Sequence, residues 1–141
     1  MDYLITVPDL KEEEEIDDGL MAYNLSMVPP SQEEPFYKIC RCAKDTDGKV
    51  IGGILACSML WNILSVVTLW VAEEYRGKGI AGELLFQAEE EAKEKGCYLS
   101  QLDTFDFQAR EFYEKRGYQV FGTLPDAPRG HEHYYMYKRL L

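Results

Sequence analysis

A glycine-rich loop between an apolar strand and an amphipathic helix is the feature that most restricts the fold of this chain. Residues 76–82 read Arg-Gly-Lys-Gly-Ile-Ala-Gly and follow the β-branched run of residues 63–71. After the loop, apolar residues recur at helical spacing as far as Ala92, and Gly96 follows as a C-cap. Free backbone N–H groups and the dipole at a helix start form an anion site. The loop therefore predicts a strand–loop–helix unit that holds an anionic group such as a phosphate.

Two other interpretations of this loop stay open. The glycines at 77, 79 and 82 also match the dinucleotide fingerprint, with Asp103 in the place of a ribose-binding acid. Against dinucleotide binding, five residues separate Val71 from Gly77, and only 38 residues follow Asp103, too few for further βαβ units. A glycine turn that only packs the helix close to the strand is the structural alternative. A Walker A loop is excluded because no Ser or Thr follows Lys78.

Hydrophobic periodicity and turn residues divide the rest of the chain into helices and strands. Three strands in succession predict an antiparallel meander, and the later alternation of strands and helices predicts a mixed α+β sheet. The expected helices cover residues 9–19 or 9–24, 80–95 and 108–116. The expected strands cover residues 36–43, 50–60, 63–71, 98–104, 118–123 and 133–140, with loops at 29–35 and 125–130.

The net charge of −10 is concentrated near the N-terminus. Residues 1–35 hold ten Asp or Glu against Lys11 alone, so this segment carries nine of the ten excess negative charges. Such a field repels nucleic acid and favours a positively charged ligand. The alternative is that residues 11–18 are only the solvated face of a helix, which is the usual role of a charge run.

The chain contains no apolar run of the roughly 18–20 residues that cross a bilayer, and its N-terminus lacks the pattern of a signal peptide. We therefore expect no membrane partner and a cytoplasmic location. Cys40, Cys42, Cys57 and Cys97 form no CxxC pair and are expected to be reduced core thiols. His131 and His133 alone are too few for a zinc site, so no metal is expected.

Two motifs give the chain a specific resemblance to a known family. The segment from Leu69 to Ala81 resembles the signature Arg/Gln-x-x-Gly-x-Gly/Ala after a strand, here with Arg76, Gly79 and Ala81. Residues 106–118 resemble the second signature, Asn-x-x-Ala-x-x-x-Tyr-x-x-x-Gly-Phe. One helix and one strand separate the motifs, as in that family. The chain is identified as a member of the GNAT superfamily of acetyl-CoA-dependent N-acetyltransferases.

This resemblance implies a fold and an activity. The fold would be a single GNAT-type domain over residues 1–141, with a central twisted, mostly antiparallel sheet of about six or seven strands flanked by helices. The activity would be transfer of an acetyl group from acetyl-CoA, as co-substrate, to a primary amine of a small molecule or peptide. The resemblance also makes a homodimer plausible. An acyl-CoA-binding sensor without transfer activity is the alternative function.

The resemblance further assigns roles to residues around the loop. The amides of residues 77–82 would hold the pyrophosphate, and a bend near the end of strand 63–71 would free the backbone of Leu69 and Val71 for the pantetheine. Tyr113 would be the catalytic acid that protonates the departing thiolate; without the motif, it would be a core residue beside Phe112. The residues implied to contact coenzyme A are Leu69, Trp70, Val71, Arg76, Gly77, Lys78, Gly79, Ile80, Ala81, Gly82, Asp106, Ala109 and Phe112.

Two departures from the family pattern affect the site. Asp106 replaces the Asn of the second motif, which exchanges an amide that donates and accepts for an acceptor. Strand residues 65–68 hold no carboxylate to act as general base, so the base is open among Asp103, Glu34, His131, His133 and a water chain. The acceptor pocket is expected from the N-terminal helix and the loops 29–35 and 125–130.

Overall fold

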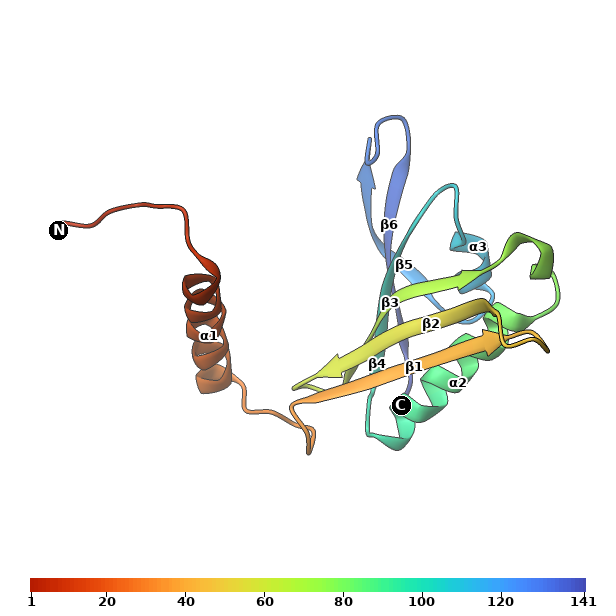
Figure 1. Ribbon diagram of the computed structural model, residues 1–141, viewed down its shortest axis with the longest axis horizontal. Helices are drawn as coiled ribbons and strands as arrows, with labels where there is room; N and C mark the ends of the chain where they lie inside the picture. The colour runs from red at the N-terminus through yellow and green to blue at the C-terminus, as the bar shows by residue number, and fades with distance from the viewer. The chain divides into compact units, whose positions relative to one another are not determined.

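The computed structural model describes residues 1–141, which form two units, residues 1–31 and residues 32–141. The first unit contains helix α1 (Leu10–Met27) (Figure 1). Asp9 caps it: the Asp9 carboxylate accepts from the Glu12 amide at 2.8 Å, and the Glu12 side chain accepts from the Asp9 amide at 3.0 Å. The acidic first turn suits the positive end of the helix dipole.

Helix α1 continues past both expected ends, Gly19 and Asn24, to Met27. An internal glycine costs a helix only about 1 kcal/mol, and good helix formers flank Gly19. The actual stop is the pair Pro29 and Pro30, because a residue before proline is driven out of the helical region. Val28 accordingly has extended backbone angles, φ −133° and ψ 104°.

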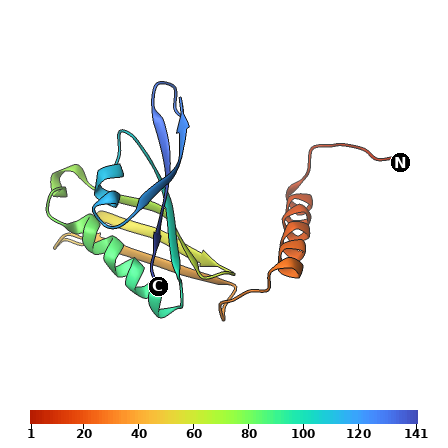
Figure 2. The same cartoon turned by 180° about the vertical axis from the view of Figure 1, so that it is seen from behind.

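The second unit is built on one six-stranded sheet (Figures 1 and 2). Its order is β1-β2-β3-β4-β6-β5, and every neighbouring pair is antiparallel except β3 and β4. This arrangement confirms the predicted meander and the mostly antiparallel sheet. The strands are β1 (Phe36–Lys44), β2 (Val50–Met59), β3 (Ile63–Val71), β4 (Leu99–Phe105), β5 (Gln119–Pro125) and β6 (Glu132–Arg139).

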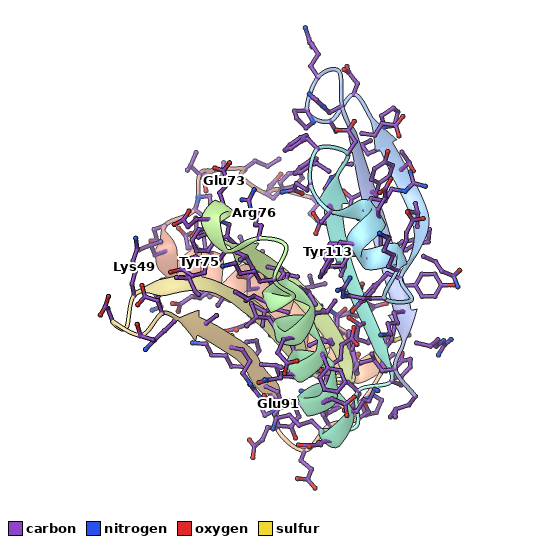
Figure 3. All side chains as sticks on the ribbon, turned by 90° about the vertical axis from the view of Figure 1, so that its right-hand side faces the viewer. Lys49, Glu73, Tyr75, Arg76, Glu91 and Tyr113 are labelled. Atoms are coloured by element: carbon purple, nitrogen blue, oxygen red, sulfur yellow. The ribbon has the colours of Figure 1, made fainter.

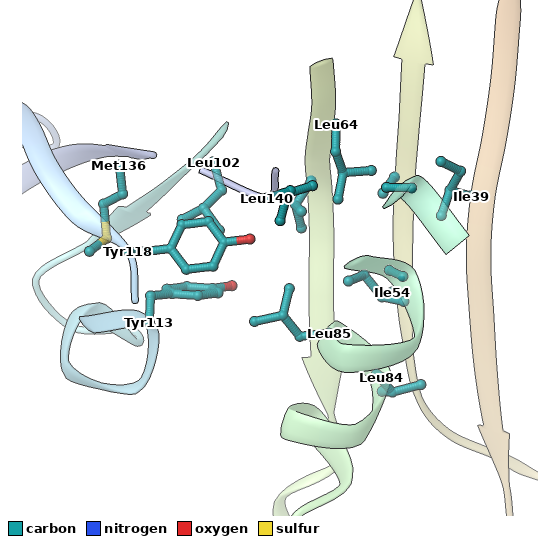
Figure 4. Packing of buried hydrophobic residues seen from close by; sticks show 14 of the residues in the cluster. Ile39, Ile54, Leu64, Leu84, Leu85, Leu102, Tyr113, Tyr118, Met136 and Leu140 are labelled. Carbon is teal, nitrogen blue, oxygen red and sulfur yellow. The ribbon is translucent and has the colours of Figure 1, made fainter. Parts of the chain in front are cut away.

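Helix α2 (Ile80–Glu94) connects β3 to β4 and packs against β1, β2 and β3. Its buried stripe of Leu84, Leu85, Ala88 and Ala92 has the i, i+4 spacing of an amphipathic helix. Together with strand residues such as Ile54 it forms the hydrophobic core (Figure 4). The helix ends as expected, since Gly96 takes the left-handed angle φ +88° just after the C-cap Lys95.

Helix α3 (Arg110–Glu114) is only five residues long, which corrects the expected span of 108–116. Residues 106–109 form a turn instead, because the Gln108 side chain accepts a hydrogen bond from the Phe105 amide at 2.8 Å. The short helix still buries Tyr113 against the core (Figure 4). The second motif therefore consists of a turn that a side-chain hydrogen bond stabilises, followed by a short helix.

Strands β3 and β4 separate soon after they meet. Their parallel pairing joins only Ile63–Ser65 to Leu99–Gln101, so β3 has no partner strand on that side from Val66 onward. On its other side, the β2 register shifts between Leu55 and Ala56, which leaves Val67 out of the ladder as in a β-bulge. The sheet is therefore split between two halves, β1–β3 and β4–β6.

The four cysteine thiols are free, but they are not all in the core. Cys97 is buried, Cys40 and Cys57 are half-buried, and Cys42 is exposed. The expectation of core thiols is therefore wrong for Cys42, because β1 lies at the edge of the sheet and α2 covers only one of its faces. No helix of the structure is long and apolar enough to cross a membrane.

Candidate active site

A cavity of about 1410 Å³ lies where the two halves of the sheet separate. It is bordered by the end of β3, the glycine loop, the start of α2, β4 and α3. Tyr113 borders it from the α3 side and Arg76 from the glycine loop (Figure 3). Every residue that the GNAT resemblance assigned to coenzyme A borders this cavity except Lys78, whose ammonium instead lies 5.6 Å from the Tyr75 ring.

The glycine loop takes a shape that side chains would oppose. After a single 3-10 turn at Glu73–Tyr75, Gly77 and Gly79 have φ angles of +76° and +83°, in the left-handed region that favours glycine. A Cβ at either glycine would meet no protein atom within 4 Å, so the space beside the loop is open. The first backbone amide of α2 with an acceptor inside this unit is Glu83, which donates to the Gly79 carbonyl. The amides before it are left for an anion.

Arg76 closes the loop rather than reaching into open space. Its Nε donates to the Val71 carbonyl oxygen at 3.0 Å, which ties the loop to the last residue of β3. The Val71 carbonyl is thus already used within the protein. The resemblance assigned the backbone of Leu69 and Val71 to the pantetheine. The Val71 carbonyl has a protein partner instead.

Arg116 lies beside the start of α2, and the sequence analysis missed it. Its guanidinium stacks 3.8 Å from the Phe112 ring centre, and Nη1 donates to the Phe112 carbonyl at 3.1 Å. A Cβ at Gly82 would lie 2.6 Å from Arg116 Nη2, so the missing side chain of Gly82 makes room for this cation. An arginine beside an anion-binding helix start suits phosphate recognition. The only sequence signal was its place just before Gly117 in the second motif.

Tyr113 is buried, yet its hydroxyl has no hydrogen-bond partner in the protein. Burial, and to a smaller degree the charge of Asp103, raise the pKa of Tyr113 to about 12. The phenol therefore keeps its proton throughout the neutral range. Tyr118 differs: its hydroxyl lies 2.7 Å from Ser100 Oγ and 2.8 Å from Glu89 Oε2, which makes it a structural residue.

Asp106 borders the cavity, but both of its carboxylate oxygens have partners within the protein. Oδ1 lies 2.8 Å from His131 Nδ1, and Oδ2 accepts from the Glu132 amide at 2.9 Å. The hydrogen bond from the Glu132 amide is the main cause that lowers the pKa of Asp106, and His131 adds to it. Asp106 therefore ties the turn before α3 to the start of β6.

The structure separates the candidate bases. Asp103 borders the cavity and lies 2.6 Å from His133, measured from Oδ2 to Nε2. His131 is bound to Asp106, and Glu34 lies in the segment before β1, outside the cavity lining. No group of three or more His, Cys, Asp or Glu side chains is arranged to hold a metal ion.

The comparison with known families agrees with this geometry. The family described as Acetyltransferase (GNAT) family matches residues 8–118. The chain belongs to the GNAT acetyltransferase family. A blasticidin-S acetyltransferase of Streptomyces morookaense is 34% identical over 117 residues, which is 82% of this chain and 85% of that protein.

Solved structures support the same assignment. An acetyltransferase of Bacillus cereus superposes with a TM-score of 0.90 at 36% identity and covers 97% of each chain. An acetyltransferase of Bacillus anthracis, solved in complex with acetyl coenzyme A, has a TM-score of 0.65 at 25% identity, covering 76% of this chain and 64% of its own. This GNAT protein is therefore an acyltransferase, and neither the dinucleotide interpretation nor the sensor alternative is favoured.

Proposed function

We propose that this GNAT acetyltransferase takes its acetyl group from acetyl-CoA and transfers it to a primary amine of a small molecule or peptide. The amine would attack the donor directly while both are bound. The observation that carries the proposal is the cavity at the split of the sheet, with the free amides of α2 at one end and the unpartnered Tyr113 hydroxyl beside it. The blasticidin-S acetyltransferase relative and the Bacillus anthracis complex with acetyl coenzyme A support the same kind of reaction.

The donor would bind along the split. The amides at the start of α2 and the helix dipole would hold the pyrophosphate, with Arg116 as an adjacent cation. The side of β3 without a partner strand, from Val66 onward, offers backbone groups with which the amides of a pantetheine can pair like an added strand. Bound in this way, the thioester would lie near Tyr113.

Tyr113 would then supply the proton that the leaving group needs. Attack forms a bond from the amine nitrogen to the carbonyl carbon, and the carbon–sulfur bond breaks. The Tyr113 hydroxyl gives its proton to the thiolate sulfur and is reprotonated from solvent. The ammonium form of the acceptor must lose one proton to solvent before it attacks, and the nitrogen loses a second proton to solvent as the amide forms. This second proton balances the one that Tyr113 gives to the sulfur and regains from solvent.

A panel of amines tests the proposal directly. With acetyl-CoA and the purified protein, we expect release of free thiol that depends on the added amine, together with a product whose mass has gained one acetyl group. The proposal would be contradicted if the protein bound acetyl-CoA but no amine of a broad panel caused release of thiol.

The single domain over residues 1–141 and the homodimer stay predictions, which limited proteolysis and light scattering would test.

A further inference from the structure

Residues on both faces of strand β4 border the cavity. Leu102 and Thr104 are buried, and Leu102 belongs to the core that contains Tyr113. Asp103 lies between them and points to the opposite face, because side chains alternate along a strand. All three border the cavity. The cavity therefore passes through the split sheet, from the side of Tyr113 to the side of Asp103.

Asp103 is held in place and still has a free oxygen. His133 Nε2 lies 2.6 Å from Asp103 Oδ2, and Oδ1 has no partner in the protein. The Asp103 side chain is 52% exposed, whereas the His133 side chain is 15% exposed. The remaining carboxylates of the cavity, Asp106, Glu111 and Glu114, belong to α3 or to the turn before it. Asp103 is therefore the only carboxylate of the cavity lining that lies on a strand.

A row of rings surrounds Asp103 on this face. Phe105 is paired with His133, and Asp103 with Tyr135, in the ladder between β4 and β6. The aromatic row runs through successive ring contacts, with centroids 4.3 to 6.4 Å apart. Its members are Phe107, Phe105, His133, Tyr135 and Phe121.

The aromatic row is exposed at both of its ends and at Tyr135, whereas Phe105 and His133 are half-buried. Phe107 is 59% exposed and Phe121 is 62% exposed, which marks a surface for a ligand rather than a core. The face of an aromatic ring attracts a cation and stacks on a flat group. A carboxylate with a free oxygen beside such rings suits an organic cation that carries a ring.

We propose that the acceptor is an ammonium compound with a flat ring, and that Asp103 binds its reacting amine while the aromatic row stacks on the ring. His133 is then a positioning residue that orients the carboxylate. This inference rests on the proposed function, because it assigns the cavity on the Tyr113 side to the donor. Asp103 and Tyr113 border the same cavity, so an amine held at Asp103 would approach a thioester bound on the Tyr113 side from the other face of the sheet.

Binding of a simple aromatic cation tests this inference. The probe is 2-phenylethylammonium chloride, and its neutral twin is 2-phenylethanol, both titrated into the coenzyme A complex and followed by NMR shifts. We expect the cation to bind roughly tenfold more tightly than the alcohol, with shifts at residues 103–107 and 133–135. Asp103→Asn should remove this preference. Glu132→Gln is the control, because it removes an exposed charge next to His133 and Glu132 does not border the cavity. This variant should change the preference for the cation by less than about twofold.

Acetylation of 2-phenylethylamine tests the role of His133. His133→Ala should raise the KM for the amine roughly tenfold, and His133→Gln, which keeps a hydrogen-bond donor, should recover part of that loss. A purely structural His133 would leave this KM unchanged in the folded variant. Wild-type affinity in Asp103→Asn, no binding of the cation, or shifts confined to other residues would overturn the inference. Calorimetry with coenzyme A separates the two proposals, because absent coenzyme A binding would refute the proposed function itself.

Discussion

At the scale of single residues, two tyrosines of similar burial have different surroundings. Tyr113 has a hydroxyl without a partner that faces a cavity, whereas the Tyr118 hydroxyl is bound to Ser100 and Glu89. Packing explains both rings, which contact each other at 5.7 Å between centroids. It does not explain why one of the two hydroxyls is left free to donate. That difference is what separates a proton donor from a structural tyrosine.

Tyr113→Phe should therefore lower kcat by roughly 10- to 1,000-fold, with the lower part of that range favoured because a thiolate leaves readily even without a proton. The melting temperature and the affinity for acetyl-CoA should barely change, since no protein partner loses a bond. Single-turnover kinetics measures the chemical step. Tyr118→Phe is the matched control: it should lower the free energy of unfolding by about 1–3 kcal/mol, because Glu89 loses a buried donor, with the chemical step intact. A wild-type rate of the chemical step in Tyr113→Phe would show that Tyr113 is only a core residue and not the proton donor.

Asp106 gives a prediction about pH. Its folded pKa lies below the ordinary value of 3.8, mainly because the Glu132 amide donates to the carboxylate. A group with a lowered folded pKa stabilises the protein above its unfolded pKa, and the contribution disappears as the pH falls through the folded pKa. Asp106→Asn should therefore be less stable than wild type at neutral pH, and the difference should shrink below the ordinary pKa.

Urea unfolding of both proteins between about pH 7 and pH 3 measures this difference. Asn keeps the size of the side chain and removes its titration, but it also places an NH2 donor where the carboxylate has an acceptor. The effect of that donor does not depend on ionisation of Asp106, so the change of the stability difference with pH reports the charge. A difference in unfolding free energy that stays constant across this range would show that the Asp106 carboxylate contributes nothing through its ionisation.

At the scale of elements, the start of α2 is a helix end without a side-chain cap. Its N-cap is Gly79, whose backbone is left-handed and whose missing side chain leaves open space. Serine, threonine or aspartate would satisfy a helix amide there, so a bare glycine leaves the amides to a ligand. The contrast with Asp9, which caps α1 fully, points to a binding role for the start of α2.

Gly79→Val should weaken the binding of coenzyme A by tenfold or more, roughly 1.4 kcal/mol, because a side chain would occupy the space beside the amides. Gly48→Val is a matched control: Gly48 has φ +84° and equally open surroundings, but it lies in the turn between β1 and β2, away from the cavity. Both variants carry the same backbone strain. Calorimetry measures the affinity of both folded variants for coenzyme A. Equal affinities would refute the role of the glycine loop.

The local elements were predictable to the extent that local chemistry determines them. Strand β3 has the predicted bounds, since a β-branched run is closed by Asn62 on one side and Ala72 on the other. Helix α3 was predicted too long because Gln108 bonds to the Phe105 amide and holds a turn, a contact that periodicity does not reveal. The pairing of Asp103 with His133 depends on the register between β4 and β6, so the sequence left both as separate candidates.

At the scale of the whole molecule, the remaining question is whether the net charge of −10 assists function. A negative field attracts a cationic acceptor over a distance that salt controls, since the screening length falls from about 30 Å at 0.01 M to about 3 Å at 1 M. For a positively charged acceptor, kcat/KM should fall as salt rises, with kcat little changed. Saturating acetyl-CoA keeps repulsion of the anionic donor out of the measurement.

The acidic run near the N-terminus can be tested separately from the rest of the charge. Changing Glu13, Glu14 and Glu15 together to Gln removes three charges, keeps good helix formers and leaves the Asp9–Glu12 capping box intact. If the run attracts the acceptor, the triple variant should show a lower kcat/KM at low salt and a weaker dependence on salt, while the values should converge at high salt, where screening removes the field. If wild type and variant have the same salt dependence, residues 11–18 are only the solvated face of α1. In that case Asp103 would account for a preference for cations by itself, because a carboxylate in direct contact with the ammonium is screened far less than a distant charge.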